Sequence, residues 1–299
     1  MDKIICFFCF SRKGALVIQR NVVSALFIPF LKLSCFLLVT TLKVSDLMTT
    51  MFVKLKELED FHWFPAILRK HQMEFIGILV SFFGFYRKIV DTIKKEMVQH
   101  HIHHVTDLCS GSGLPAVYVY KRLNQPGLIM DLTDKFPQEV SLPSGMNYIG
   151  HPIDVYDLIP EEDSYYTMFN AFHHFDKDEQ QKMIQKFLDQ KSHLMIVEIV
   201  QPTLLHVVLV TLASTLGVWL LCPLIRPFDY KRLILTYLIT INVLTVLTDG
   251  FISILKSRTE RQFKKDMAEM FENTNRIQVS SHWSFPAQLI TIKVSPDHV

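Results

Sequence analysis

The residues best suited to chemistry lie in one glycine-containing segment, residues 104–116, with the sequence HVTDLCSGSGLPA. A short apolar run reaches Asp107, two glycines follow at Gly111 and Gly113, and a helical pattern begins directly after them. The backbone amides of such a loop, together with the N-terminus of the next helix, attract strongly polar or anionic groups. This segment therefore predicts a loop that cradles a nucleotide-like ligand.

Two kinds of nucleotide ligand fit this loop. Gly111, Gly113 and Ala116 match the G-x-G-x-x-A fingerprint of dinucleotide-binding folds. However, Asp107 at the strand end would repel a pyrophosphate, and Pro115 removes a backbone donor from the first helical turn. An adenosyl-sulfonium cofactor instead carries an amino group that a carboxylate attracts. The loop thus favours this cofactor over a nicotinamide dinucleotide.

Short strands and helices alternate around the loop. Between residues 105 and 200 the β-rich runs are VTDLC, LIMDL, NYIGHPI, YYTMFNAF and HLMIVEIV, and the helical stretches between them are AVYVYKRL and DEQQKMIQKFLDQ. Such alternation predicts a parallel sheet with helices on both faces. Residues 55–95 carry the spacing of two helices that meet near Gly84, and residues 256–299 end in a charged amphipathic helix and one alternating strand. The expected fold is Rossmann-like α/β with added N-terminal helices.

The chain resembles the class I S-adenosylmethionine-dependent methyltransferases over roughly residues 55–295. The segment VTDLCSGSG is similar to their first motif. It has Cys109-Ser110 where Gly-Cys or Gly-Ser is usual, so the loop has one glycine fewer. The resemblance implies S-adenosylmethionine as cofactor, with Asp134, or else Asp131, on the ribose hydroxyls, and Asp154 with the Val155 amide on the adenine. The residues that it implies in cofactor binding are Asp107, Cys109, Ser110, Gly111, Gly113, Asp131, Asp134, Asp154, Val155 and Asn170.

Three further segments resemble a bacterial-type subgroup of that superfamily. They are an F-N-x-F-H-H-F run at residues 169–175, a W-F-P-x-x-x-R segment at residues 63–69, and a D-G-x-x-S-x-L element that starts at Asp249, with the usual arginine displaced to Arg258. His173 and His174 are candidate bases for a proton on the acceptor. The alternative is that one histidine caps the next helix and the other packs under the cofactor. Trp63 and Arg69 are candidates for a lid over the substrate, or for ordinary packing.

Composition limits the partners. The chain has 49% hydrophobic residues, 20% charged residues and a mean hydropathy of +0.22, which indicates a soluble core with a few membrane-grade segments. Its formal charge of +2 gives no field that would recruit nucleic acid. Five cysteines in mostly apolar runs do not form the pattern of a secreted disulfide framework. The tract HHIHH at residues 100–104 is interpreted as a solvated strand entry, so no metal site is predicted.

Two apolar segments near the C-terminal half predict a helical hairpin inserted into the α/β domain. Residues 204–225 lack Asp, Glu, Lys and Arg, whereas residues 233–247 are short for a membrane span. We expect residues 204–247 to contact a membrane, preferably lying in the interface because Arg226, Lys231 and Arg232 occupy the turn. The acceptor would then be hydrophobic or lipidic and the catalytic domain cytoplasmic. The alternative is an ordinary lid packed on the N-terminal helices.

The first fifty residues allow two interpretations. Residues 22–42 are an apolar run behind Arg12, Lys13 and Arg20, typical of a membrane anchor. Alternatively, the native chain starts at Met48 or Met51. The predicted organisation is an extension at 1–50, a helical cap at 51–100, a cofactor-binding core at 101–202, the hairpin at 203–255 and a closing unit at 256–299. The competing function is a membrane-associated scaffold that keeps a degenerate methyltransferase fold.

Overall fold

The computed structural model describes residues 55–272 and 274–296. The expected anchor at residues 22–42 and the alternative starts at Met48 and Met51 lie outside the described residues. All statements below concern the described part of the chain.

Seven strands form one mixed sheet in the order β3-β2-β1-β4-β5-β7-β6. The strands are β1 (His104–Leu108), β2 (Ile129–Leu132), β3 (Met146–Tyr148), β4 (Tyr165–Phe169), β5 (His193–Glu198), β6 (Ile277–Ser284) and β7 (Ala287–Val294). The first five are parallel, and β7 runs antiparallel to both β5 and β6. The strand order reverses between β1 and β4, which is where open α/β sheets bind ligands. The predicted Rossmann-like α/β fold is confirmed.

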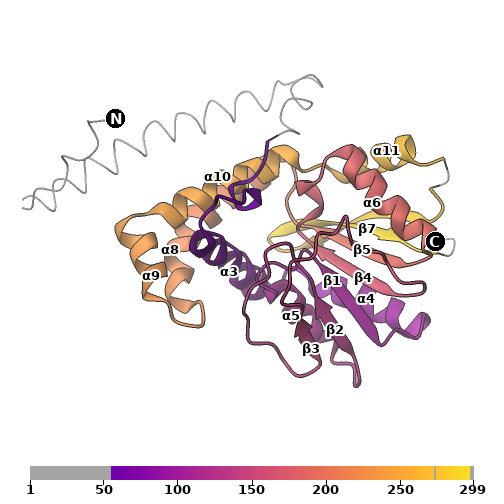
Figure 1. The fold of residues 1–299 in the computed structure, drawn as a ribbon. Coiled ribbons are helices and arrows are strands. Elements are labelled where there is room, and N and C mark those ends of the chain that lie inside the picture. Colours follow the sequence, from indigo (N-terminus) through magenta and orange to yellow (C-terminus); the bar gives the residue numbers. More distant parts are fainter. Residues whose placement is uncertain (1–54, 273, 297–299) are drawn as a thin grey trace, which may run out of the picture. The chain divides into compact units, whose positions relative to one another are not determined.

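Helices cover both faces of the sheet (Figure 1). They are α4 (Arg87–Gln99) and α5 (Leu114–Leu123) on one face, and α6 (Lys177–Asp189) and α11 (Glu260–Met270) on the other. Ile89 and Val119 belong to the apolar cluster of the first face, and Phe187 and Phe263 belong to that of the second. Asp176 caps α6 by accepting from the Glu179 amide, which fixes where this helix starts next to the site. The two apolar layers thus pack the helices against the two faces of the sheet.

The C-terminal part departs from the prediction of one closing strand. Strands β6 and β7 form an antiparallel hairpin, with Ser284 paired to Ala287 across a two-residue turn. The turn contains Phe285 and Pro286. Proline has no N–H for a strand ladder, so it ends one strand and allows the next to begin. The alternating pattern correctly predicted strand structure on each side of this turn.

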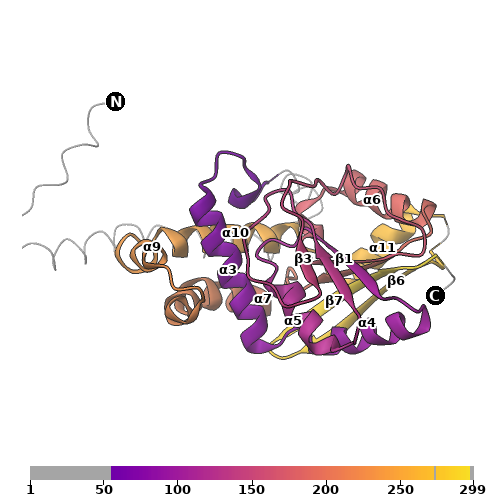
Figure 2. The ribbon, with the colours of Figure 1, turned by 60° about the horizontal axis from the view of Figure 1, so that its bottom comes forward.

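The first predicted helix is α3 (Ala66–Phe83), and it ends at Gly84 in the left-handed conformation with φ of 63°. The predicted hairpin is more divided than expected, because its second half bends by 78° at a break between Leu238 and Ile241. The elements are α7 (Leu204–Leu212), η3 (Ala213–Gly217), α8 (Val218–Leu221), η4 (Cys222–Leu224), α9 (Tyr230–Leu233), η5 (Ile234–Leu238) and α10 (Ile241–Lys256). Figures 1 and 2 show this group beside α3 at one end of the sheet.

The hairpin packs on α3 through both apolar and charged contacts. Phe75 of α3 lies in one cluster with Val218, Leu221, Val243 and Val246. At the turn, Arg232 is buried and donates to Glu74 at 2.6 Å. Leu204–Leu224 is long and apolar enough to cross a membrane, and 22% of its apolar window is buried. The turn is therefore fixed to α3 and does not extend freely beyond it.

Candidate active site

The glycine loop that follows β1 has a left-handed backbone at three of its residues, two of which are glycines. Cys109, Gly111 and Gly113 have φ values of 54°, 54° and 69°, in the left-handed region that glycine adopts without steric penalty. Non-glycine Cys109 is the exception. The Gly113 amide donates to the Ser110 carbonyl at 2.8 Å, which closes a tight turn. Helix α5 starts directly after this turn, so its N-terminus faces the same side as the loop amides.

Asp107 lies beneath the loop and holds it. Its carboxylate accepts hydrogen bonds from Ser110 Oγ at 2.7 Å and Thr167 Oγ1 at 2.6 Å, and the residue is 1% exposed. Burial raises the pKa of Asp107 to about 7, although both hydroxyl hydrogen bonds act in the opposite direction. The carboxylate predicted to face a ligand thus positions the loop that faces it.

The two ribose candidates, Asp134 and Asp131, lie in different places: Asp134 lines a cavity next to the loop, and Asp131 does not. Asp134 lines the cavity and accepts from the Gly111 amide at 2.8 Å and the Phe136 amide at 2.7 Å. Burial raises the pKa of Asp134. Asp131 instead pairs with His104 at 2.8 Å and accepts from Asn147 at 3.0 Å, outside the residues that line the cavity. The structure thus brings only Asp134 of this pair to the loop.

The adenine candidates also reach the cavity. Asp154 and Val155 line it beside the loop. Burial alone would raise the pKa of Asp154, but the hydrogen bonds from Lys135 and the Tyr156 amide lower it. Asn170 has a φ of 54° and accepts from the Ile199 amide at 2.8 Å, which ties the ends of β4 and β5 together. These residues come from three segments that only the sheet brings together.

One cavity of about 950 Å³ extends from this polar rim into the helical group. That volume is near the upper end of the roughly 300–1,000 Å³ of small-molecule sites. Its polar part includes Ser110, Gly111, Asp134, Asp154, Asn170, Glu57, Glu59, Asp60, His173 and His174. Its apolar part includes Phe75, Leu79, Phe83, Leu209, Leu220, Leu221, Val246 and Phe285. The two parts are continuous, so two ligands of different polarity can meet there.

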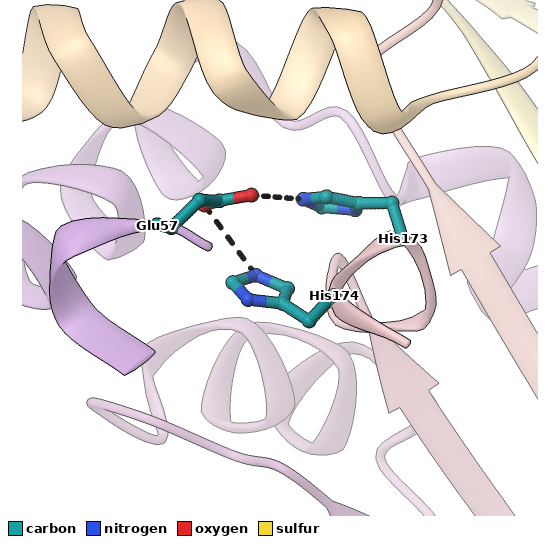
Figure 3. A group of neighbouring side chains, drawn as sticks. All are labelled: Glu57, His173 and His174. Carbon is teal, nitrogen blue, oxygen red and sulfur yellow. Dashed lines mark ion pairs between the residues drawn. The ribbon is translucent and has the colours of Figure 1, made fainter. Parts of the chain in front are cut away.

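His173 lines this cavity and is 4% exposed. Its ring points toward Glu57 (Figure 3). Its Nδ1 donates to Glu198 at 2.6 Å, and its Nε2 lies 3.5 Å from Glu57 Oε1. Burial alone would lower the pKa of His173, but the carboxylates of Glu198, which accepts its hydrogen bond, and of nearby Glu57 outweigh it and raise the pKa to about 10. The predicted base therefore holds its proton at neutral pH.

His174 faces the same glutamate from the other side. Its Nδ1 donates to Asp60 at 2.9 Å, and its Nε2 lies 3.6 Å from Glu57 Oε2. Burial alone would lower the pKa of His174, but the charges of Glu57 and Asp60 outweigh it and raise the pKa. In the same cluster, burial raises the pKa of Glu59 to about 8. Both histidines are thus oriented by carboxylates on their Nδ1 atoms.

The segment that carries Glu57 is fastened by the element that begins at Asp249. This carboxylate accepts from the Leu58 amide at 2.7 Å and the Glu59 amide at 3.2 Å, while Ser253 Oγ donates to Glu57 at 3.1 Å. The D-G-x-x-S spacing thus places two polar groups one helical turn apart on α10, facing η1 (Leu58–Asp60). Sequence reasoning missed Glu57, Glu198 and this role of Asp249. The D-G-x-x-S motif was the available signal.

The two candidate lid residues have other surroundings. Arg69 is 5% exposed, donates to the carbonyls of Glu59 and Phe61 at 2.9 and 2.7 Å, and lies 4.0 Å above the Phe136 ring. Trp63 is 68% exposed. Neither residue lines the cavity. Arg69 therefore fastens residues 59–61 near the site, while Trp63 points to solvent.

The comparisons with known proteins give only distant similarity. No family model and no curated protein matches the sequence. The fold is similar to human N-acetylserotonin methyltransferase in complex with SAM, at 12% identity and a TM-score of 0.39, over 72% of this chain and 59% of that one. It is also similar to the mitomycin 7-O-methyltransferase MmcR, at 15% identity and a TM-score of 0.37, over 66% and 50%. A third similar structure is the plantazolicin methyltransferase BpumL in complex with SAH, at 10% identity and a TM-score of 0.42. The match covers 78% of this chain and 88% of that one. The chain thus spans 59% of the first of these proteins and 50% of the second.

Proposed function

We propose that this chain is an S-adenosylmethionine-dependent methyltransferase that acts on a hydrophobic acceptor. The observation that carries the proposal is the single cavity that joins the glycine loop to an apolar chamber. Its position at the carboxyl ends of β1, β4 and β5 is the usual ligand position in open α/β sheets. The cofactor would lie over the loop, with the acceptor in the apolar part.

The charge of the polar part favours a sulfonium over a diphosphate. Its acidic lining residues are Glu57, Glu59, Asp60, Asp134, Asp154, Glu179 and Asp249. Lys56 and Lys135 also line it, and Lys135 is paired with Asp154 at 2.8 Å. Burial raises the pKa of Glu59 to about 8, and His173 holds its proton, but the other six carboxyl groups still outnumber these cationic groups. A lining with this excess of carboxylates attracts the cationic sulfonium and amino groups of the cofactor and repels phosphates. This supports the adenosyl-sulfonium interpretation of the loop over the dinucleotide one.

Asp134 keeps acceptor positions for the proposed ribose contact. Asp134 uses one lone pair on each carboxylate oxygen for a backbone amide, so each oxygen retains a second for a ribose hydroxyl. Asp154 and the Val155 amide supply an acceptor and a donor for the adenine. Asp107 acts as a positioning residue for the loop. Asn170 joins the lining where β4 ends.

The reaction is an in-line displacement. A heteroatom of the acceptor supplies an electron pair to the methyl carbon, the carbon–sulfur bond breaks with its pair on sulfur, and the acceptor proton passes to solvent. Positioning the two reactants supplies most of the rate gain in such a site. Because His173 holds its proton, this chemistry relies on orientation rather than on that imidazole as a base.

The acceptor chamber and the outer surface of the hairpin are both apolar. Leu212, Leu216, Trp219, Leu220, Leu238 and Ile239 are exposed large apolar residues of this group. An exposed apolar patch of this kind marks an interaction surface. Since Arg232 is paired with Glu74, its charge does not oppose membrane contact. We propose that the hairpin lies in the cytoplasmic membrane interface and admits a hydrophobic acceptor from it.

Calorimetry with S-adenosylmethionine and with its demethylated product tests the cofactor part. The proposal predicts binding of both, and weaker binding by Gly111→Val, which places a side chain at a φ of 54° in the loop. A folded protein that binds neither ligand at millimolar concentration would instead support the scaffold interpretation.

Vesicle flotation tests the membrane part. The described residues all belong to one compact unit, so a chain that starts at Met51 isolates the hairpin from the first apolar run. We expect this chain to float with anionic vesicles and Leu220→Asp with Leu238→Asp to reduce flotation. Val98→Asp with Ile159→Asp, at exposed positions elsewhere, is the matched control. Equal flotation of both double variants would contradict the proposed surface.

A further inference from the structure

We propose that Glu57, His173 and His174 bind a divalent transition-metal cation of the zinc class. Two distant segments bring these residues together, and one ligand atom from each lies within 4.8 Å of the others. Figure 3 shows both imidazoles directed at the same carboxylate. A set of two histidines and one carboxylate is a recurring ligand set for zinc and for non-haem iron. The sequence had predicted no metal site.

The distances fit one ion between the three side chains. His173 Nε2 is 3.5 Å from Glu57 Oε1, and His174 Nε2 is 3.6 Å from Glu57 Oε2. Two ligands that each lie about 2.1 Å from a tetrahedral zinc ion are roughly 3.4 Å apart. Each separation is long for a hydrogen bond and close to that ligand spacing, and the two contacts use different oxygens of Glu57. Small side-chain rotations would complete the coordination.

The outer carboxylates orient the imidazoles as metal ligands are oriented. His173 Nδ1 donates to Glu198 at 2.6 Å, and His174 Nδ1 donates to Asp60 at 2.9 Å. A histidine that binds a metal through one nitrogen almost always donates its other N–H to a carboxylate, a carbonyl or water. Two adjacent histidines share this arrangement here, and each leaves Nε2 for the same point.

Two of the buried side-chain atoms that lack a hydrogen bond in the described part of the chain lie in this cluster. They are His173 Nε2 and Glu57 Oε1, in residues that are 4% and 2% exposed. They face each other across the proposed ion position. Buried polar atoms normally have hydrogen-bond partners, and a bound ion is one established reason for an exception. Their mutual orientation thus supplies an observation that is independent of the ligand types.

A plain ion-pair network is the competing explanation. Lys256 Nζ lies 4.0 Å from Glu57 Oε1 and donates to the His174 carbonyl at 3.1 Å. In that network the imidazolium groups and Lys256 neutralise Glu57, and no metal binds. Metal content therefore separates the two explanations without reference to catalysis.

The position of the site suggests a role that rests on the proposed function. All three residues line the cavity between the glycine loop and the apolar chamber. With three protein ligands, a tetrahedral ion has one open position, which takes water or a substrate oxygen or nitrogen. An acceptor hydroxyl bound there loses its proton to solvent more readily, and its oxygen then forms the bond to the methyl carbon as the carbon–sulfur bond breaks.

The experiment measures metal directly. The full chain is stripped with a chelator, equilibrated with Zn²⁺ or Co²⁺, dialysed and analysed by inductively coupled plasma mass spectrometry and visible absorption. We expect about one ion per chain, with Co²⁺ bands of a tetrahedral site. A folded wild-type chain that retains no ion overturns the proposal, whatever its affinity for S-adenosylmethionine.

Matched variants locate the ion. His174→Ala and Glu57→Gln should abolish retention, and Asp60→Asn should weaken Zn²⁺ affinity by about 10–100-fold. His100→Ala is the control because Glu96, His100 and His193 form the other histidine-containing cluster of the described residues. Loss of the ion in His100→Ala but not in His174→Ala would overturn the assignment. Calorimetry with S-adenosylmethionine on the same variants reports separately on the proposed function.

Discussion

Replacement of Asp134 by asparagine tests the cofactor position most sharply among single substitutions. Asp134 accepts from the Gly111 and Phe136 amides at 2.8 and 2.7 Å. In asparagine one of the two oxygens becomes an NH₂ donor, which faces one of these N–H groups in either orientation. The variant therefore loses one charge-assisted hydrogen bond in the loop and, in our proposal, one acceptor for a ribose hydroxyl.

The structure sets the expected magnitude. Loss of an acceptor that leaves a hydroxyl unpaired in a partly dry site weakens binding by about 1–3 kcal/mol. This corresponds to roughly a 5- to 150-fold loss of S-adenosylmethionine affinity. Loss of the backbone hydrogen bond should also lower the free energy of unfolding by about 1–3 kcal/mol.

Isothermal titration calorimetry measures the affinity, and urea unfolding measures the stability separately. Asp131→Asn is the matched control because Asp131 pairs with His104 and Asn147 away from the cavity. Its cofactor affinity should stay within about twofold of wild type, since surface substitutions change free energies by only about 0.5 kcal/mol. Equal losses in both variants, or no loss in Asp134→Asn, would refute the assignment of Asp134 to the ribose.

Three further predictions concern the supports of the site. Burial raises the pKa of Asp107 from 3.8 to about 7, so the folded state resists ionisation and wild type loses stability as pH rises through this range. As pH rises from about 4 to about 7, the free energy of unfolding of Asp107→Asn, measured with urea, should increase by up to roughly 4 kcal/mol relative to that of wild type. A difference between the two proteins that does not change with pH would contradict the raised pKa of Asp107. A Cβ on Gly77 would lie 2.5 Å from Leu114 Cβ, so Gly77→Ala should lower the melting temperature by forcing α3 away from α5, at about 1–3 kcal/mol; an unchanged melting temperature would mean that the helices are not so close. Arg232→Met leaves the buried Glu74 with only Lys70, at 3.9 Å, as an ion-pair partner and should destabilise by up to about 3–5 kcal/mol, whereas Arg232→Met with Glu74→Leu should recover most of this; additive losses on chemical denaturation would argue against the docked hairpin turn.

The sequence was sufficient for the parts of the site that depend on local pattern. The loop at residues 107–113, the strand that precedes it and the helix that follows it lie within one short segment, where spacing and glycine chemistry decide the structure. Asp134 was preferred over Asp131 because it follows the strand, and the structure places it against Gly111. Strand alternation likewise predicted the five parallel strands.

The contacts that sequence reasoning missed join residues far apart in the chain. Glu57 meets His173, and Asp249 binds the amides of residues 58 and 59, only after the sheet and the helical group have assembled. Charge was misleading in the hairpin turn, because Arg232 is buried against Glu74 and not exposed. The single predicted closing strand was wrong because the consequence of Pro286 was overlooked.

The central claim is methyl transfer to a hydrophobic acceptor bound in the apolar part of the cavity. The most direct measurement incubates the full chain with S-adenosylmethionine labelled in its methyl group and with separate lipid and aqueous metabolite extracts, and then follows the label. We predict label in a lipid-extract product that partitions into organic solvent, with a strong reduction in Asp134→Asn. A folded, cofactor-binding chain that labels only a water-soluble product, or transfers no label to either extract, would contradict the account.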